Sequence, residues 1–572
     1  MTCRPGVIDT AHEGQVDSLH TLLLGLRPMA LSPKASPRKP RKARPRATTR
    51  PTAPVVTPEP EKTPDLIGVV DVGSRALRMA VAEIAPGRLR RLETLLAPVA
   101  IGLDTFSHGR IRAVTSEVVI RTLRDFALAL ETYQLKPADC LAVATTAVRD
   151  ATNREVFLDF VQQRTGFRVQ VLEAIEETRL AHQLTWRLMG ERLATGRSLV
   201  LALGAGGTQI ILQNGEDLEL AESRSFGTLK LLELRPSART VGSARRFLQK
   251  VVASIARVHE LATVESVVAI SGELHRLLVG LGHPSQPNRG ICLDRAGFQK
   301  LANHLDTSTL KEVAEDSGVD ISMAELARMA FEELRAFTTP CSPERVFIPE
   351  SSMLDSLLLD ATLKSQMPEQ VDNDTPVESA AWAVARRYHI SITHARQVRL
   401  LALQLFDGTR DMSGLGERAR TLLAVAAILH DIGIFVSTHR HERHSAYLIE
   451  ASEVMGLNPS ELARVAAIVR HHRHPFRDID TRDLGPLRSR ERVEVLKLTA
   501  LLRIADALDT THHHRVVRLR VATTHEELQV IIETQAGERE GFADLQRAFC
   551  GKADLLEEVF GMKPRLIEVL AE

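Results

Sequence analysis

The chain has 572 residues, too many for one core, and at roughly 100–200 residues per domain this length predicts three to four domains. Hydrophobic residues make up 44% and charged residues 25%, as in globular proteins, and a net charge of +1 excludes a strong overall field for nucleic acid or membrane. Five scattered cysteines without a CxxC pair argue against a disulfide framework and a thiolate zinc site. With no apolar run of the ~18 residues that span a bilayer, we expect a cytoplasmic protein with no membrane contact.

Residues 1–64 differ from the rest of the chain. The stretch Lys34–Arg50 is rich in Lys, Arg and Pro and contains no acidic residue. Such a composition buries too little apolar surface to offset its ordering entropy, so we expect a disordered basic and Pro-rich tail. Two interpretations stay open, a tail that binds polyanions and a solvated leader, and both Met1 and Met29 are candidate starts.

From Asp65 the pattern becomes α/β. A strand, a tight turn and a return strand are followed by helical periods, and this order occurs twice. The expected strands are Leu66–Asp71, Arg78–Ile84, Leu141–Thr145, Leu199–Leu203 and Ile210–Leu212, and the expected helices are Glu117–Glu131, Arg154–Thr165 and Glu176–Leu188. The repetition predicts two similar lobes, the first over residues 65–197 and the second over residues 198–366.

Beyond a Pro- and Asp-rich joint at Met367–Pro376 the strand signals fade. Helical periodicity dominates, and it predicts an all-α domain over residues 377–515. A hairpin of Val516–Thr523 and Leu528–Thr534, then one or two helices, is expected in a C-terminal α+β extension over residues 516–572.

Two turns carry the features of phosphate sites. Asp71 ends a buried strand, Gly73 permits a tight turn, and Ser74 offers a hydroxyl and an amide to an anion. The second turn also follows a buried strand, and it offers glycines and a hydroxyl group in the residues Gly204, Gly206, Gly207 and Thr208. Either turn alone is more often only a turn, but two of them opening similar lobes predict a phosphate or nucleotide site between the lobes.

Several segments, in the right order, resemble the exopolyphosphatase/guanosine-pentaphosphate phosphatase (Ppx/GppA) family. The first phosphate motif of that family is similar to Ile67–Arg78, and its "ATSAxRxAxN" segment is similar to Ala144–Asn153. The remaining similar segments are Leu172–Leu180, Ser225–Lys230, Ser271–Leu274 and Val346–Asp360. The resemblance covers residues 65 to about 530.

The resemblance implies a duplicated actin/hexokinase/Hsp70-like (ribonuclease H-like) α/β fold followed by an all-α HD domain. It also implies hydrolysis of a terminal phosphoanhydride with Mg²⁺ in the cleft. Glu177 is then the base that activates water, with its neighbour Glu176 as the alternative. Arg149 is expected to neutralise the charge that develops on the phosphate.

The chain departs from the family pattern at the second turn. Ala202 stands where the family has a metal-side aspartate, and Gln209 stands where it has a glutamate. Alanine offers no metal ligand and the amide of glutamine offers no charge, so weakened Mg²⁺ binding is expected. Further departures are Arg75-Ala76 in place of Asn-Ser and Leu354–Ser356 in place of Arg-Glu-Gly. An active cleft and a degenerate one both stay open.

A second group of polar residues is spread over the helical region. His394 begins a helix with an apolar stripe, the pair His430-Asp431 ends another, and Asp506 lies on a third. Burying a charge without a partner is costly, so a shared metal is the simplest explanation. Hydrogen bonds between helices are the alternative.

This series resembles the HD phosphohydrolase superfamily. The resemblance implies that His394, His430, Asp431 and Asp506 hold one metal, and that His444 and His472 help to hold a second. Mn²⁺, Fe²⁺ or Zn²⁺ suits such imidazole and carboxylate ligands. The run His512–His514 resembles a metal tract, but we expect a solvated loop.

We therefore expect a phosphohydrolase that releases terminal phosphate from inorganic polyphosphate or guanosine pentaphosphate. One alternative places the chemistry at the HD metal site, beside a degenerate cleft. Another is a non-catalytic sensor of polyphosphate or an alarmone. The sequence leaves the substrate, and the choice between monomer and homodimer, open.

Overall fold

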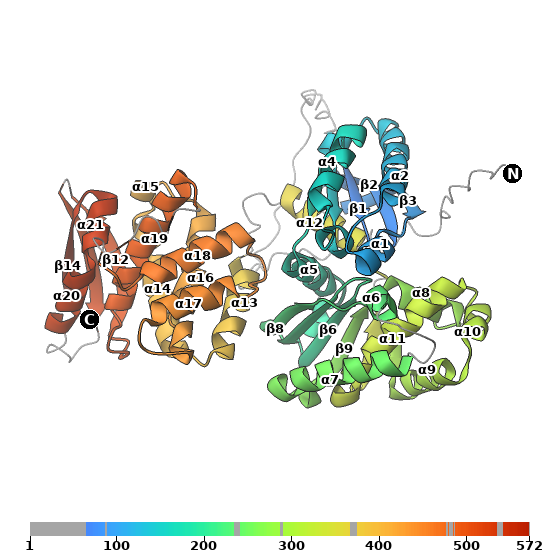
Figure 1. The fold of residues 1–572 in the computed structure, drawn as a ribbon. Coiled ribbons are helices and arrows are strands. Elements are labelled where there is room, and N and C mark those ends of the chain that lie inside the picture. The colour runs from blue at the N-terminus through green and yellow to red at the C-terminus, as the bar shows by residue number, and fades with distance from the viewer. Residues whose placement is uncertain are drawn as a thin grey trace, which may run out of the picture.

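The computed structural model describes residues 65–570 apart from 86–87, 234–240, 287–289, 367–373, 476–478, 480–483, 485–486, 525 and 535–541. The expected disordered tail, residues 1–64, lies outside the described residues. Two α/β lobes lie one above the other, and a helical domain with a small C-terminal sheet lies beside them (Figure 1).

Lobe I is built on a five-stranded sheet in the order β3-β2-β1-β4-β5. Its strands are β1 (Asp65–Val72), β2 (Ala76–Ala85), β3 (Arg88–Pro98), β4 (Leu141–Ala144) and β5 (Val169–Val171). Its helices are α1 (Ile101–His108), α2 (Ala113–Glu131), α3 (Thr146–Arg149), α4 (Arg154–Thr165) and α5 (Ala174–Leu193). β1, β2 and β3 are antiparallel, whereas β4 and β5 run parallel to β1.

Lobe II repeats this topology in a six-stranded sheet, β10-β11-β9-β6-β7-β8. Its strands are β6 (Arg197–Leu203), β7 (Thr208–Asn214), β8 (Asp217–Arg224), β9 (Ser266–Ile270), β10 (Ile291–Asp294) and β11 (Arg345–Ile348). β6, β7 and β8 form an antiparallel meander, and β9 and β11 continue the sheet in parallel with β6. The predicted duplication of an actin-like lobe is confirmed by this shared order.

The helices of lobe II are α6 (Thr228–Glu233), α7 (Val241–His259), α8 (Gly272–Gly280), α9 (Arg295–Thr307), α10 (Leu310–Ser317) and α11 (Ile321–Cys341). The helix that follows, α12 (Met353–Gln366), packs against β1, β2 and α5. Its residues Leu354, Leu357 and Leu358 are buried with Val69 and Ala80 of lobe I. In packing, α12 thus belongs to lobe I, although the sequence placed it at the end of lobe II.

The helical domain consists of α13 (Asp374–Arg387), α14 (Ile392–Gly408), α15 (Arg410–Ser413), α16 (Glu417–Leu429), η4 (Ile432–Phe435), α17 (His441–Glu450), α18 (Pro459–His471) and α19 (Ser489–Ala507). The C-terminal extension has β12 (Val516–Thr523), β13 (Glu527–Thr534), α20 (Phe542–Lys552), α21 (Asp554–Phe560) and β14 (Lys563–Leu570). The predicted hairpin is β12 and β13, and β14 adds a third strand parallel to β13.

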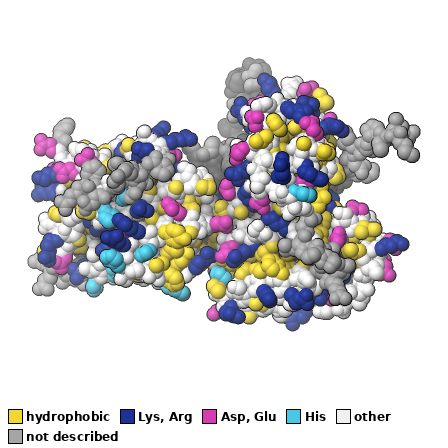
Figure 2. Space-filling view, in the orientation of Figure 1, with side chains coloured by type: hydrophobic (Ala, Val, Ile, Leu, Met, Phe, Trp, Pro, Cys, Tyr) yellow, Lys and Arg dark blue, Asp and Glu magenta, His cyan; other side chains and the backbone are white. Residues whose placement is uncertain are grey.

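Helix α13 joins the helical domain to lobe II. Val377, Ala381 and Val384 on this helix belong to one hydrophobic core with Val200 and Leu218 of the lobe II sheet. Positive and negative side chains are interspersed over the visible face (Figure 2), in keeping with the net charge of +1. Among the described helices, none is both long and apolar enough to cross a membrane.

Candidate functional site between the lobes and a histidine cluster in the helical domain

The first phosphate turn follows β1. The amide of Gly73 donates to the carbonyl of Ala76 at 3.2 Å, which closes the hairpin over Ser74. Asp71 is only 2% exposed, and its Oδ2 accepts from Nη1 of Arg78 at 3.1 Å. Burial raises the pKa of Asp71, and Arg78 opposes that shift. The other oxygen, Oδ1, is buried without a hydrogen-bond partner among the described residues, so it is available to a cation.

The second phosphate turn, Gly204–Thr208, lies against lobe I. The amide of Gly204 donates to the carbonyl of Gly207 at 3.0 Å and closes the turn. A Cβ at Gly206 would lie 2.7 Å from both Phe106 and Thr146 of lobe I, so a larger residue has no room there. The glycine-rich turn therefore lets the two lobes meet closely beside the start of α3.

Glu177 lies on α5 and is buried beside Arg149 of α3. Nη1 of Arg149 donates to Glu177 Oε1 and, at 2.6 Å, to the carbonyl of Leu172, while Nη2 donates to Thr146 at 3.1 Å. Burial raises the pKa of Glu177, Arg149 opposes the shift, and the negative charge of Asp71 adds to it. Asp71, Arg149 and Glu177 therefore belong to one electrostatic cluster.

Glu176 is oriented differently from Glu177. Its two carboxylate oxygens accept from Arg179 at 2.9 and 2.7 Å, and the same guanidinium reaches Asp360 of α12 at 2.8 Å. This ion cluster ties α5 to α12, which gives Glu176 a structural contact. Glu177 is the member of the pair that contacts Arg149.

Ala202 and Gln209 are direct partners across β6 and β7. Nε2 of Gln209 donates to Glu177 Oε2 at 3.4 Å, so this side chain enters the acidic cluster without a charge. Ala202 is 8% exposed and contributes no donor atom. Asp71 and Glu177 therefore remain as carboxylates that fit Mg²⁺, with the unpartnered Oδ1 of Asp71 as the clearest candidate ligand atom.

Two ion pairs bridge the lobes. Nη1 of Arg75, in the first turn, lies 3.1 Å from Oε1 of Glu273 at the start of α8. Nζ of Lys230, on α6, lies 2.7 Å from Oδ2 of Asp150 and 4.9 Å from the ring centroid of Phe106. The sequence did not predict these contacts, although Asp150 and Lys230 both lie in segments that resemble the family.

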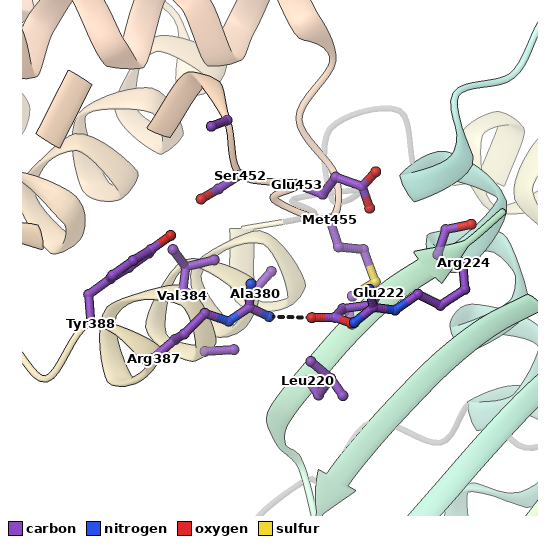
Figure 3. A pocket seen from close by; sticks show the side chains of 14 residues that line it. Leu220, Glu222, Arg224, Ala380, Val384, Arg387, Tyr388, Ser452, Glu453 and Met455 are labelled. Carbon is purple, nitrogen blue, oxygen red and sulfur yellow. Dashed lines mark hydrogen bonds and ion pairs between the residues drawn. The ribbon is translucent and has the colours of Figure 1, made fainter. Parts of the chain in front are cut away.

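A cavity of about 270 Å³ lies between β8 and the helical domain. Arg387 points from α13 to Glu222 on β8 at 2.8 Å, and Arg224 pairs with the same carboxylate (Figure 3). Glu453 lines the cavity from the segment after α17. Burial raises the pKa of Glu453, and a hydrogen bond from the backbone of Ser223 opposes that shift.

In the helical domain, His394, His430 and Asp431 form one group with ligand atoms within 4.8 Å of one another. Asp431, His441 and His472 form a second group of this kind. Asp431, which directly precedes η4, is shared by both groups. Residues on α14 and α17, and the residues that directly follow α16 and α18, therefore meet at one carboxylate. The geometry thus brings together four of the six residues predicted as metal ligands.

The remaining two predicted ligands are placed differently. Asp506 Oδ1 lies 3.6 Å from His394 and 3.9 Å from His430, while its Oδ2 pairs with Lys552 of α20. His444 is half-buried and belongs to neither group, whereas Nε2 of His441 lies 3.0 Å from Asp431. A Cβ at Gly433 would lie 2.2 Å from the His441 carbonyl and 2.3 Å from the Ser445 amide, so the 441/445 side of α17 faces η4.

The ring orientations suit a metal. Nδ1 of His430 contacts the carbonyl of Ala427 at 2.8 Å, and Nδ1 of His472 contacts that of Val469 at 2.6 Å. Nδ1 of His394 contacts Asp509 at 2.7 Å. Because a carbonyl only accepts, Nδ1 of His430 and of His472 must carry the ring hydrogen. Nε2 of each ring is then unprotonated, and its lone pair points away from that carbonyl. Nε2 of His430 is buried without a hydrogen-bond partner among the described residues, as expected of a ligand atom.

Strong pKa shifts accompany this packing. Burial lowers the pKa of His472 to about 3. Burial also opposes the charged form of His394, but hydrogen bonds to Asp506 and Asp509 raise its pKa to about 9. Asp509 is thus a hydrogen-bond partner of His394 that the predicted ligand set did not include, although the sequence places it three residues after Asp506.

The run His512–His514 borders the same cluster. His512 is exposed, as expected of a solvated loop, but its ring stacks on His394 with centroids 3.8 Å apart and planes 5° apart. His514 contacts Asp509 through its backbone amide at 2.9 Å and Nδ1 at 3.1 Å. The loop therefore covers the outer side of His394.

Comparison with known proteins connects both parts of the chain to one family. A family model described as Ppx/GppA phosphatase family matches residues 80–304, and one described as Ppx/GppA phosphatase, domain III, matches residues 378–543. The guanosine-5'-triphosphate,3'-diphosphate pyrophosphatase of Aeromonas hydrophila is 24% identical over 453 residues, which cover 77% of this chain and 86% of that protein. The protein of the same name from Aeromonas salmonicida is 23% identical with the same coverage.

Two solved structures are also similar. A Ppx/GppA family member from Aquifex aeolicus has 18% identity and a TM-score of 0.44, and an exopolyphosphatase from Cytophaga hutchinsonii has 18% identity and a TM-score of 0.46. Each match covers 52% of this chain and 98% of the other. Because the two family models together match more than half of the chain, over its lobes and its helical domain, the protein belongs to the Ppx/GppA phosphatase family.

Proposed function

We propose that this protein is a phosphoanhydride hydrolase that releases terminal phosphate from inorganic polyphosphate or guanosine pentaphosphate. The observation that carries the proposal is the pair of buried carboxyl groups of Asp71 and Glu177, with Arg149 on Glu177, beside two phosphate turns. Family membership supports the reaction class, and the names of the Aeromonas and Cytophaga relatives support the two substrate classes.

The chemistry follows from the charges in the cleft. Backbone amides of the two turns are the expected contacts of the phosphate chain, since glycines allow an anion to approach closely. Arg149 is the side chain that offsets negative charge on the terminal phosphate. Glu177, as a carboxylate, takes the proton of the attacking water on one of its oxygens. The water oxygen then bonds to phosphorus as the bond to the bridging oxygen breaks.

A divalent cation completes this site. Members of the family generally depend on a divalent metal, and Mg²⁺ would shield the phosphate oxygens in the cleft. Asp71 and Glu177 are the residues that would hold it. With Ala202 and Gln209 in place of carboxylates, we expect weaker metal binding than four acidic positions would give.

A matched pair of variants tests the proposal. Phosphate release from polyphosphate and from guanosine pentaphosphate is measured for wild type, Glu177→Gln and Glu176→Gln in the presence of Mg²⁺. Because only Glu177 contacts Arg149, we expect Glu177→Gln to lose release by about a hundredfold or more, and Glu176→Gln to keep most of it. Equal release by all three proteins would contradict the proposal.

A second candidate function is supported by the histidine cluster. His394, His430, Asp431, His441 and His472 fit a site for Mn²⁺, Fe²⁺ or Zn²⁺, and Asp506 lies beside it. A metal held there would supply an activated water for a phosphoester. Phosphate release that survives Glu177→Gln and disappears in Asp431→Asn would assign the chemistry to this HD-type site.

A non-catalytic sensor is the third outcome of the same experiment. In that case, calorimetry detects binding of polyphosphate or guanosine pentaphosphate, and no variant or wild type releases phosphate. The substitutions at Ala202 and Gln209 are the observation that motivates this comparison.

A further inference from the structure

Glu333 is a buried carboxyl group that is paired with no cationic side chain among the described residues. It lies on α11, is 0% exposed and is surrounded by the apolar core of lobe II. Its Oε1 has no hydrogen-bond partner among the described residues, and its Oε2 lies 2.6 Å from Oγ1 of Thr208. The neighbouring Glu332 differs, because Arg245 and Arg335 both pair with it. An unpaired carboxylate in such a place is costly, which favours the neutral acid.

The hydrogen bonds of Thr208 support the same conclusion. Its hydroxyl oxygen lies 3.0 Å from the carbonyl oxygen of Phe226 and 2.6 Å from Glu333. A carbonyl only accepts, and a hydroxyl carries one hydrogen. If Thr208 donates to Phe226, the contact with Glu333 needs a hydrogen from the carboxyl group. A protonated Glu333 therefore satisfies every group in this chain of contacts.

This chain of contacts ends on the second phosphate turn. Thr208 is the last residue of the Gly204–Thr208 turn, and Phe226 precedes Gly227. A Cβ at Gly227 would lie 2.5 Å from the Gly204 carbonyl and 2.6 Å from the Gly207 amide, so this segment is pressed onto the turn. The link from α11 through Thr208 to Phe226 thus sets how the turn lies against its supporting segment.

We propose that Glu333 is a positioning residue for the second phosphate turn, and that it acts as a carboxylic acid that donates a hydrogen bond to Thr208. The role of Glu333 in turnover rests on the proposed function. Its role in holding the turn is independent of the proposed function.

The proposal has a direct pH consequence. Burial raises the pKa of Glu333 to about 8, and the Thr208 hydroxyl opposes the shift. Helices α6, α7, α8 and α10 and strand β6 pack against α11. No charged side chain among the described residues of these elements contributes to the shift. Glu332, Arg245, Arg335 and Asp306 form their own ion cluster.

The sign of the effect on stability is determined by proton uptake. The folded state keeps a proton on Glu333 up to about pH 8, whereas the unfolded chain releases it near the ordinary glutamate pKa of 4.5. The stabilisation is therefore complete below pH 4.5 and is lost as the pH rises toward about 8. Above that pH, the Glu333 carboxylate can only accept, so the single hydrogen of the Thr208 hydroxyl is drawn to Glu333 and the hydrogen bond to the Phe226 carbonyl is lost.

Glu333→Gln tests the proposal, because the amide is similar in shape, donates a hydrogen bond and does not titrate. The melting temperature is measured from pH 5 to pH 9 for wild type, Glu333→Gln, Thr208→Ser and Thr208→Val. We expect the melting temperatures of wild type and Thr208→Ser to fall as the pH rises. The melting temperature of Glu333→Gln should fall less over the same pH range. Thr208→Val lacks the acceptor, so its melting temperature should fall at every pH. Parallel curves for wild type and Glu333→Gln would overturn the proposal.

Turnover provides the second readout. The ratio of phosphate release at pH 9 to that at pH 7 should be about tenfold higher in Glu333→Gln than in wild type, since a group with a pKa near 8 is about nine-tenths ionised at pH 9. An unchanged ratio in an active protein would refute the role in turnover. If no form releases phosphate, the proposed function fails, and the melting curves still decide the role of Glu333 in holding the turn.

Discussion

The side-chain amide of Gln209 donates to Oε2 of Glu177 at 3.4 Å, while Arg149 donates to the other carboxylate oxygen. The carboxylate is thus held by one charged and one neutral donor. A glutamate at position 209 would present a second negative charge to Glu177 instead. Gln209 therefore holds Glu177 without adding a negative charge, and it offers no charged ligand to a metal.

Gln209→Glu should make the stability of the protein depend on Mg²⁺. A like-charge pair costing about 1–2 kcal/mol lowers the melting temperature by roughly 2–8 °C in a chelator, and Mg²⁺ should restore the loss. Gln209→Met is the control, because it removes the hydrogen bond without adding a charge. The idea fails if Mg²⁺ raises the melting temperature of Gln209→Glu no more than that of wild type.

The double variant Ala202→Asp with Gln209→Glu should hydrolyse polyphosphate faster than wild type. Positions 202 and 209 are partners across β6 and β7, so two added carboxylates would lie side by side. Recovery of a charge-stabilising contact worth about 3 kcal/mol corresponds to about a hundredfold in rate. Initial rates against Mg²⁺ concentration provide the measurement, with Ala202→Asn as the uncharged control. A wild type as fast as the double variant would mean that these carboxylates are dispensable.

The acid side of the pH profile should report Glu177. Its pKa is raised by burial above the usual 4.5, and Arg149 opposes that shift. Because the carboxylate is the active form, kcat/KM should fall as the pH drops through the raised pKa. Arg149→Met removes the opposing charge, so the acid limb of the residual activity should move to higher pH. An acid limb at the same pH in both proteins would indicate that another group controls it.

Metal content should distinguish His441 from His444. Because only His441 lies within 3.0 Å of Asp431, His441→Ala should lose much of the bound transition metal, and His444→Ala should retain it. The measurement is elemental analysis of protein loaded with Mn²⁺, Fe²⁺ or Zn²⁺ and then dialysed. Retention by His441→Ala with loss by His444→Ala would instead support the ligand set inferred from the sequence.

Much of the fold could be predicted from local pattern. The predicted helix Arg154–Thr165 is α4, and the predicted strand Leu66–Asp71 lies within β1. These elements could be predicted because their buried positions are apolar and recur with the period of a helix or a strand. The predicted strands did not include β3, β5, β8, β9, β10, β11 and β14. The sequence of β3 mixes charged and apolar residues, and a register shift between Val81 and Ala82 interrupts its pairing with β2.

Tertiary packing explains most of the other differences. The apolar positions Leu354, Leu357 and Leu358 predict a buried face on α12, but not that the chain returns to lobe I to bury it. Likewise, His441 and His444 lie one turn apart on α17, and only the close approach of Gly433 determines which of them faces Asp431. The residue types indicated a metal-type cluster. Which histidines belong to it depends on contacts between residues that are distant in sequence.

The two ion pairs across the lobes have a consequence for how the enzyme cycles. Arg75–Glu273 and Lys230–Asp150 link the two lobes in this structure, yet their side chains are between 16% and 36% exposed. Dissolved salt screens pairs of this kind, so the energy needed to separate the lobes should decrease as ionic strength rises. Where lobe separation limits the escape of phosphate, turnover would be governed by the electrolyte around the protein, and moderate salt would accelerate it rather than inhibit it.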